Sequence, residues 1–448
     1  MSVSHSLRRK LWLLSAVGAL IGMIATVAAK VLIEAIALVT NLFYFQKFSF
    51  HETELIHHQF PWYFIFIPVI GGVLVGILAR YGSSAIRGHG IPEVMEKILT
   101  GQSRIPRRIT FLKPFSSAIA IGSGGPFGAE GPIIATGASL GSWIGRHFLF
   151  SDHDRKILLA TGAAAGMTAI FGTPISAIFL CIELLLFEFS PRSFIPVVVA
   201  VSTAYSIRLL VGFTGAAFPI GEVLTVPGWN LLFYFIAGSL AGIVSCLICK
   251  FTFLVEDLFD HLPIHWMWWP ALGGIIVGVV GYIEPRSLGV GYSNITEALQ
   301  GKMLLIPALT LMFWKFISWS FALGSGTSGG TLAPLLTFGS SLGVIIGLLG
   351  KSYFPELEIS VEVTALVCMS AMFSGASRAV LTSTIFAMEA TGAHFGIAPL
   401  LLGNAAAYLF SLMLMKETIM TEKIARRGIK VPQGFFPEKQ TDSSEFRL

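Results

Sequence analysis

The segment that decides the fold runs from Gly122 to Pro132 and reads GSGGPFGAEGP. Five of its eleven residues are glycine, and apolar sequence lies on both sides of it. A backbone leaves helical form at membrane depth only where it is buried in protein or lines a cavity. Glu130 lies inside the segment, and an ionisable residue at that depth is a functional candidate by default. The segment is therefore the first candidate for a pore element.

The composition is that of a membrane protein. Of 448 residues, 54% are hydrophobic and 12% are charged, and the mean hydropathy is +0.76. Soluble domains carry about 25% charged residues, roughly twice as many. Several apolar runs reach or approach the ~20 residues that span a hydrocarbon core, and others are shorter, which predicts helices that tilt or end part-way. These runs are Trp12–Ala29, Trp62–Ala79, Leu231–Ile248, Trp269–Ile283 and Gly396–Met415.

Basic clusters near both ends predict the topology. Arg8, Arg9 and Lys10 precede the first apolar run, and a second cluster at 416–430 follows the last one. By the positive-inside rule, both termini are expected on the cytoplasmic side of the cell membrane. The first run is too long for a signal peptide. The net charge of +5 thus reflects topology, and no basic stripe with interleaved aromatics indicates nucleic-acid binding.

The sequence contains an internal repeat. The segment PVIGGVLVG at 68–76 returns as PALGGIIVG at 270–278, which is 202 residues later. GSG at 122–124 recurs at 324–326 with the same offset, and GHG at 88–90 is echoed by GVG at 289–291. We expect two homologous membrane halves, 1–220 and 221–430, followed by a short cytoplasmic tail at 431–448. Transporters built from repeats place their ion site on broken helices at the repeat interface.

The glycine-rich breaks have the chemistry of an anion site. Segments 88–92, 122–132 and 324–334 each place glycines and a proline before a helix-forming run. A helix N-terminus presents unpaired N–H groups and about half a positive charge, and glycine lets an ion approach the backbone. The Glu130 carboxylate would occupy the place of an anion there, and protonation would free that place. The alternative is a structural carboxylate that caps a helix.

These residues resemble the CLC family of chloride channels and chloride–proton antiporters, of the prokaryotic type without CBS domains. The family signatures G-S-G-I-P, G-K/R-E-G-P and G-x-F-x-P read here GHGIP at 88–92, GAEGP at 128–132 and GTLAP at 330–334. The segments at 160–171 and 421–427 also resemble the family. The resemblance covers about residues 10–430.

The resemblance implies an all-α integral membrane protein with two inverted-topology repeats of tilted and broken helices, about eighteen per subunit. It also implies a homodimer in the lipid bilayer with one pore per subunit, which carries chloride or another small monovalent anion. Glu130 would be the outer, proton-accepting gate. The expected anion-binding positions are His89, Gly90, Ile91, Gly128, Ala129, Thr331, Leu332 and Met420.

Four positions depart from the family pattern. His89 replaces the serine whose hydroxyl binds the central anion, so the anion selectivity is open, and the alternative is that His89 turns away into a vestibule. Met420 replaces the pore tyrosine, and Ala129 replaces a basic residue beside the gate. Leu184 occupies the position of the inner proton glutamate and cannot relay a proton. Glu188 is expected one helical turn from Leu184, where it is either a substitute relay or an unpaired interfacial carboxylate.

These departures favour passive or weakly proton-coupled chloride transport. The alternative is stoichiometric chloride/proton exchange through Glu130 and a substitute inner relay. An intramembrane enzyme is a remote third hypothesis, because no nucleophile–base pair or H-E-x-x-H motif supports it. We expect no cofactor or metal: Cys246 and Cys249 lack a second ligand pair, and the histidine spacing in 51–58 matches no zinc signature and indicates a solvated loop.

Overall fold

The computed structural model describes residues 5–56, 58–100, 103–148, 150–221, 226–393 and 396–432. The predicted tail at 431–448 lies almost wholly outside these residues. Within them every element of regular secondary structure is helical, and there is no β-strand. The helices of the first part are α1 (His5–Thr40), α2 (Phe66–Ile77), α3 (Ile91–Leu99), α4 (Arg107–Gly122), α5 (Glu130–His147), α6 (Asp152–Phe171), α7 (Pro174–Leu180) and α8 (Pro191–Leu210). Those of the second part are α9 (Leu231–Asp260), α10 (Trp269–Ile283), α11 (Tyr292–Leu299), α12 (Leu305–Gly324), α13 (Leu332–Tyr353), α14 (Val361–Ser377), α15 (Val380–Thr391), α16 (Ala398–Leu414) and α17 (Glu422–Arg426).

Short π-helical and 3-10 segments extend or join these helices. The π-helical ones are η1 (Asn41–Phe45), η3 (Leu78–Gly82) and η5 (Cys181–Leu186). The 3-10 ones are η2 (Trp62–Ile65), η4 (Ser84–Ile86), η6 (Gly228–Asn230), η7 (Trp266–Trp268), η8 (Pro285–Ser287) and η9 (Pro355–Leu357).

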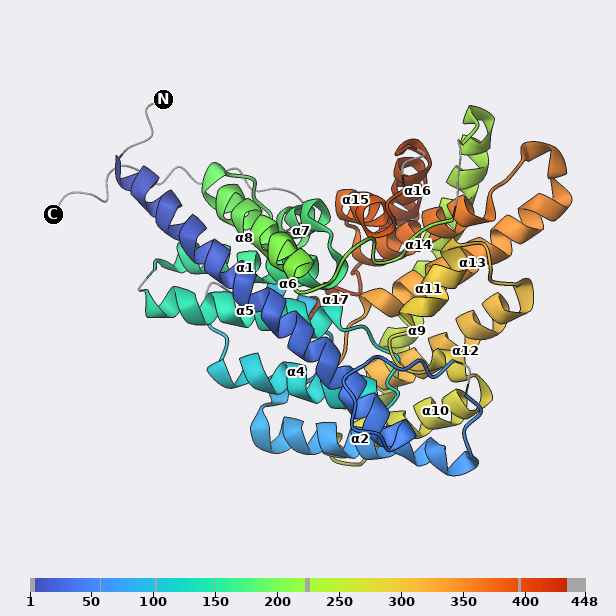
Figure 1. Ribbon diagram of the computed structural model, residues 1–448, viewed down its shortest axis with the longest axis horizontal. Coiled ribbons are helices and arrows are strands. Elements are labelled where there is room, and N and C mark those ends of the chain that lie inside the picture. Colours follow the sequence, from blue (N-terminus) through green and yellow to red (C-terminus); the bar gives the residue numbers. More distant parts are fainter. Residues whose placement is uncertain are drawn as a thin grey trace.

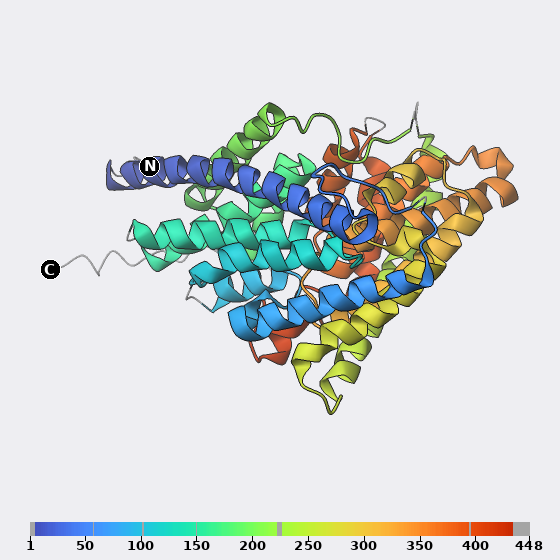
Figure 2. The same cartoon turned by 60° about the horizontal axis from the view of Figure 1, so that its bottom comes forward.

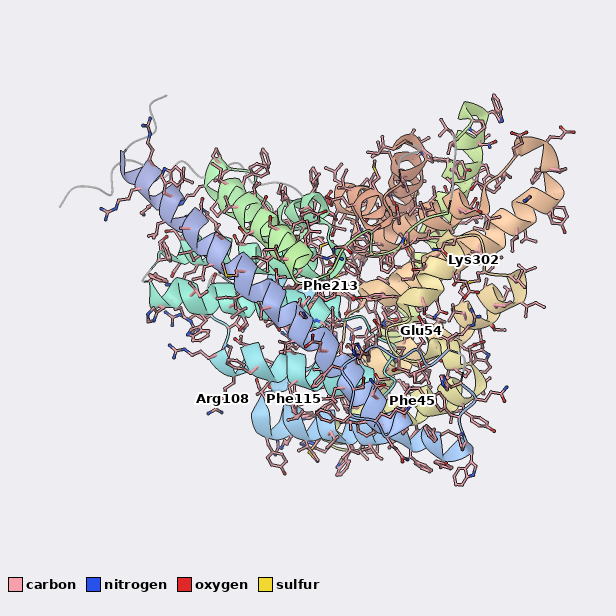
Figure 3. The ribbon with its side chains drawn as sticks, in the orientation of Figure 1. Phe45, Glu54, Arg108, Phe115, Phe213 and Lys302 are labelled. Atoms are coloured by element: carbon pink, nitrogen blue, oxygen red, sulfur yellow. The ribbon has the colours of Figure 1, made fainter. Side chains whose placement is uncertain are left out.

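The outside of the molecule is apolar. By length and composition, seven helical segments of the described chain are able to cross a membrane. Four of the five predicted apolar runs fall within these segments, and the fifth forms the shorter α16. Large apolar side chains stand on the outer faces of the helices, among them Phe115 of α4, which is 58% exposed (Figure 3). An apolar surface of this extent is stable in lipid.

The same helix pairs occur in both parts of the chain. The helix α5 packs along α6 and α1 along α8, and eight helices later α13 packs along α14 and α9 along α16. The first set lies mainly on the left of Figure 1 and the second on the right, and the turned view in Figure 2 keeps them side by side. The two parts thus share one packing scheme.

The repeated PxxGG segments pack directly against each other, on α2 and α10. A Cβ atom added to Gly72 would lie 2.3 Å from the carbonyl oxygen of Pro270. One added to Gly274 would lie 2.5 Å from the carbonyl oxygen of Pro68. The contact is reciprocal, and it brings the two backbones closer than any larger residue permits.

A second reciprocal contact joins the helices α7 and α15. The Glu389 carboxylate accepts hydrogen bonds from the amides of Ile175 and Ser176 at the start of α7, at 3.0 and 2.8 Å. The Glu183 carboxylate accepts from the amides of Leu381 and Thr382 at the start of α15, at 3.1 and 2.8 Å. Each carboxylate satisfies N–H groups that a helix start leaves unpaired.

The α2–α10 contact generates the first prediction. Gly72→Val places a side chain against rigid backbone atoms, and overpacking of this kind costs about 1–3 kcal/mol. We expect a clearly lower midpoint of thermal unfolding in detergent. Gly228→Ala is the control, because a Cβ atom there has nothing within 4 Å. Equal midpoints for both variants would contradict the close contact.

Candidate functional site

Three chain breaks meet at the centre of the molecule, before α3, α5 and α13. Gly128 and Gly330 exchange two backbone hydrogen bonds, at 3.2 and 2.9 Å. A Cβ atom on Gly131 would lie 2.2 Å from the carbonyl oxygen of His89 and 2.8 Å from Cα of Gly330. The breaks therefore touch through glycines, as the sequence pattern predicted for a site between broken helices.

Glu130 is the first residue of α5, and its side chain is fully buried. Its Oε1 accepts a hydrogen bond from the backbone N–H of Ala333 at 2.8 Å. Its Oε2 accepts one from the Tyr292 hydroxyl at 3.3 Å. Ala333 lies in the first turn of α13, so the carboxylate sits at the positive end of that helix.

Two glycines make room for this carboxylate. A Cβ atom on Gly128 would lie 1.8 Å from Oε2 of Glu130, and one on Gly330 would lie 2.6 Å from Oε1. None of the salt bridges of the described residues includes Glu130. The carboxylate is thus held by a helix N-terminus and a phenol, as a small anion would be.

His89 lies between two glycines with positive φ, Gly88 at 93° and Gly90 at 96°. Its side chain is 2% exposed, and its Nδ1 has no hydrogen-bond partner within the described protein. The backbone N–H of Gly90 donates to Oε2 of Glu93 at 2.6 Å, so this predicted anion ligand is already paired. Ile91 begins α3 directly after it.

Two buried lysines donate hydrogen bonds to the loops before α3 and α11, and neither was predicted from the sequence. Lys113 of α4 donates to the carbonyl oxygens of Ile86 and Gly88, at 2.8 and 2.7 Å. Lys315 of α12, 202 residues later, donates to that of Gly289 at 3.1 Å. Neither belongs to a salt bridge of the described chain, so their charge favours anions nearby. Their shared offset was the available signal.

The other predicted anion positions are also buried. Thr331 precedes α13 and is 1% exposed, with an unpartnered Oγ1, and Leu332 begins the helix. Ala129 precedes Glu130 and is 2% exposed. Met420 is fully buried just before α17, and its N–H donates to Oγ1 of Thr418 at 3.2 Å.

Leu184 lines a cavity of about 410 Å³, and no glycine of the three breaks lines this cavity. Two carboxylates, Glu183 and Glu417, line the same cavity. Both oxygens of the Glu183 carboxylate accept hydrogen bonds from amides at the start of α15. Glu417 accepts a hydrogen bond from Oγ1 of Thr421 at 2.7 Å, next to Met420.

The expected position of Glu188 is wrong. We placed it one helical turn beyond Leu184, but the helix takes a π-helical form in η5 and ends at Leu186. Phe187 then has a left-handed φ of 54°, which turns the chain away. Oε1 of Glu188 lies 3.8 Å from Nε2 of His153 and has no hydrogen-bond partner in the described residues, which agrees with the alternative of an unpaired carboxylate.

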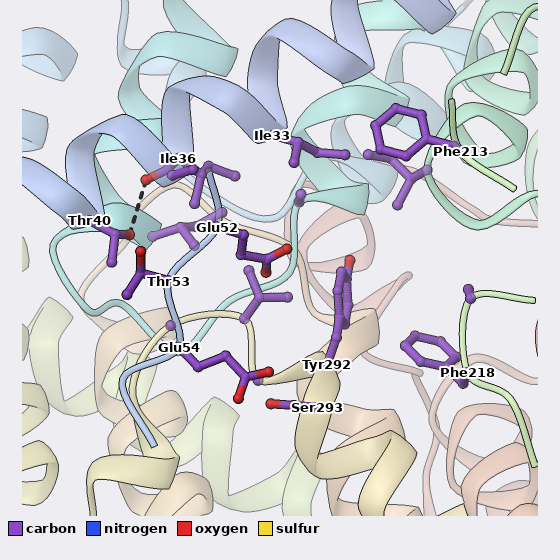
Figure 4. Close-up of a pocket in the computed structure, with 18 of the residues that line it drawn as sticks. Ile33, Ile36, Thr40, Glu52, Thr53, Glu54, Phe213, Phe218, Tyr292 and Ser293 are labelled. Carbon is purple, nitrogen blue, oxygen red and sulfur yellow. Dashed lines mark hydrogen bonds between the residues drawn. The ribbon is translucent and has the colours of Figure 1, made fainter. Parts of the chain in front are cut away.

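Two further cavities are lined in part by residues of the breaks, the first by Ala129 and the second by Gly88, Gly90 and Gly326. The first, the Tyr292 pocket, has a volume of about 380 Å³ and is lined by Glu52, Glu54, Ala129, Arg208 and Tyr292 among others (Figure 4). The second, the Lys423 pocket, has a volume of about 570 Å³. Charged residues line much of it, including Arg87, Glu93, Lys113, Lys423, Arg426 and Arg427.

Residues 70–412 match the family model described as voltage gated chloride channel. The chain belongs to the CLC family. It is similar to a ClcB-like chloride channel protein of Ralstonia nicotianae, with 28% identity over 373 residues that cover 82% of this chain and 86% of the relative. It is also similar to the H(+)/Cl(-) exchange transporter ClcA of Cronobacter sakazakii, with 26% identity over 370 residues, 81% of this chain and 79% of the relative.

The fold agrees with this membership. The crystal structure of a slow cyanobacterial Cl⁻/H⁺ antiporter superposes with a TM-score of 0.80 at 22% identity, covering 95% of this chain and 99% of that one. The chain is therefore a multi-pass membrane protein of the CLC fold that transports anions. Family members are channels and transporters, so the chain is not an enzyme.

Proposed function

We propose that this protein exchanges chloride for protons, with Glu130 as the gate. The observation that carries the proposal is the Glu130 carboxylate bound to the amide of Ala333 at the start of α13. While charged, it holds the place of an anion. Protonation removes the charge, weakens its attraction to the helix end and leaves the N–H groups to chloride.

The gate couples the two ions because they compete at one place. A chloride ion at the α13 N-terminus requires Glu130 to be displaced, and the displaced carboxyl group carries a proton. The central anion would be held by amides of Thr331, Leu332, Ala129 and Ile91 and by the His89 ring, since the amides of Gly90 and Gly128 are already paired. The unpartnered Nδ1 of His89 and Oγ1 of Thr331 supply polar atoms for it.

The orientation follows from charge. Arg8, Arg9 and Lys10 lie at one end of α1, and the loop that lines the Tyr292 pocket follows the other end. With the basic end of α1 in the cytoplasm, the Tyr292 pocket opens outward and the Lys423 pocket inward. We also propose that halves 1–220 and 221–430 form inverted repeats, which the reciprocal α2–α10 and α7–α15 contacts support. The homodimer is proposed from membership of the family alone.

Passive chloride flow is the second candidate, because Leu184 cannot relay a proton. The sequence alone favoured it, whereas the relative named as an exchange transporter supports exchange. For exchange, we place the inner relay at Glu417 in preference to Glu188. Glu417 lines the cavity of Leu184, and Glu188 does not.

The gate is tested by chloride efflux from liposomes. Glu130→Gln removes the titrating group, so flux should vary by less than about twofold between about pH 5 and pH 8. Gly128→Ala should raise flux at neutral pH, because its Cβ would collide with the Glu130 carboxylate.

A double variant controls for other effects of the alanine. In a Glu130→Ala background, Gly128→Ala should change flux little, because the atoms nearest its Cβ all belong to Glu130. Unchanged pH dependence in Glu130→Gln would remove Glu130 from the role of gate.

Exchange is tested by imposing a chloride gradient across the liposome membrane and recording the pH. We expect chloride-driven uphill proton movement in the wild type, reduced about tenfold or more in Glu417→Gln, which cannot titrate, and retained in Glu188→Gln. Chloride flux without proton movement in the wild type would establish passive flow instead.

Selectivity is tested by comparing chloride, bromide, nitrate and fluoride flux. If His89 donates to the anion, His89→Ser should change the chloride-to-nitrate ratio about fivefold, the effect of one hydrogen bond of about 1 kcal/mol. His153→Ser is the control, because that side chain is 44% exposed beside Glu188. An unchanged ratio in His89→Ser would show that this ring does not bind the anion.

A further inference from the structure

The Tyr292 hydroxyl is the only side chain of the described protein that hydrogen-bonds to the Glu130 carboxylate. Tyr292 is the first residue of α11 and follows Gly291, which has a left-handed φ of 73°. Its ring packs against the rings of Phe171 and Phe218, with distances between ring centroids of 6.0 and 5.3 Å. The ring position is therefore fixed, and the hydroxyl has little freedom to leave the carboxylate.

The loop between η1 and η2 brings carboxylates over this tyrosine. Asn41 fixes the position of this loop, because its side-chain amide donates to the carbonyl oxygens of Ser49 and His51 at 2.9 and 2.8 Å. Its Oδ1 accepts from Oγ1 of Thr53 at 2.7 Å. The neighbouring Glu52 is thereby held at the pocket, and Figure 4 shows its carboxylate and the Tyr292 hydroxyl turned into the same cavity.

The charged and titratable groups of this pocket are few. Glu52 and Glu54 come from the loop, Arg208 from α8 and Tyr292 from α11. Nη1 of Arg208 donates to the carbonyl oxygen of Phe213 at 2.7 Å. The acidic lining of the Tyr292 pocket is unexpected on an anion pathway, because negative charge lowers the local concentration of anions and raises that of protons.

We propose that Tyr292 and Glu52 jointly set the pH at which Glu130 is protonated from this pocket. The inference rests on Glu130 being the gate. The Tyr292 hydroxyl donates to the carboxylate and so stabilises the charged, closed gate. The Glu52 carboxylate lines the same pocket as Tyr292. Its negative charge would disfavour a charged Glu130 behind that tyrosine and so stabilise the protonated, open gate. The two residues therefore act in opposite directions.

The effect of Glu52 has its own pH limit. Partial desolvation in the pocket, and then the nearby Glu54 carboxylate, raise the pKa of Glu52 above its usual range. Such a carboxyl group is neutral below its raised pKa and charged above it. The influence of Glu52 on the gate is therefore lost as the pH falls through this raised pKa.

The test measures chloride flux against pH in liposomes, with equal pH on both sides. Tyr292→Phe removes one hydroxyl, so the midpoint of the curve of chloride flux against pH should rise by about one pH unit. This is the effect of one hydrogen bond to a charged group. Glu52→Gln should lower the midpoint by about half a unit, as one nearby charge does in a wet cavity, and should match the wild type in acid. Glu52→Asp keeps the charge and should stay near the wild type.

Glu356→Gln is the matched control, because Glu356 is exposed and lies outside the pocket lining. Midpoints that shift in the same direction in Tyr292→Phe and Glu52→Gln, or that do not move, would overturn the inference. If Glu130→Gln kept the wild-type pH dependence, the gate itself would fail. A flat response in Glu130→Gln with unmoved midpoints would refute only the roles of Tyr292 and Glu52.

Discussion

The hydrogen bond from the Ala333 amide to the Glu130 carboxylate places a buried negative charge on the N-terminus of α13. Such a charge is tolerated away from water only where donors satisfy it. Meeting that condition here requires a helix that starts inside the protein and glycines at 128 and 330 that leave space for the carboxylate. The same condition makes the place suitable for chloride, since the helix end binds either anion without a cationic side chain in contact.

The frame that holds this helix start is built from paired contacts between the two parts of the chain. Gly72 and Gly274 let α2 and α10 touch, and Glu183 and Glu389 each cap a helix of the other part. Broken helices lose backbone hydrogen bonds, and these contacts hold the breaks against each other so that glycine meets glycine. The buried lysines, Lys113 and Lys315, donate hydrogen bonds to carbonyl oxygens of the loops before α3 and α11.

The sequence allowed prediction of the apolar runs, the breaks and Glu130, because each depends on local composition or on a repeated pattern. It did not reveal Tyr292, whose contact with Glu130 joins residues 162 apart in the chain. The helical turn expected between Leu184 and Glu188 failed because the backbone becomes π-helical and then left-handed at Phe187, which apolar spacing does not encode. The loop at 51–58 exposes His51, Glu52, Glu54 and His58 to solvent, as interpreted, but the sequence did not show that Asn41 holds it at the Tyr292 pocket.

The central claim is that the Glu130 carboxylate and a transported anion occupy the same place. The most direct measurement is anomalous diffraction from crystals soaked in bromide, for the wild type and for Glu130→Gln. We predict bromide within hydrogen-bonding distance of the Ala333 amide in the variant, and the carboxylate at that place in the wild type near neutral pH. A variant without bromide there, or a wild type with both bromide and the carboxylate bound to that amide, would contradict the account.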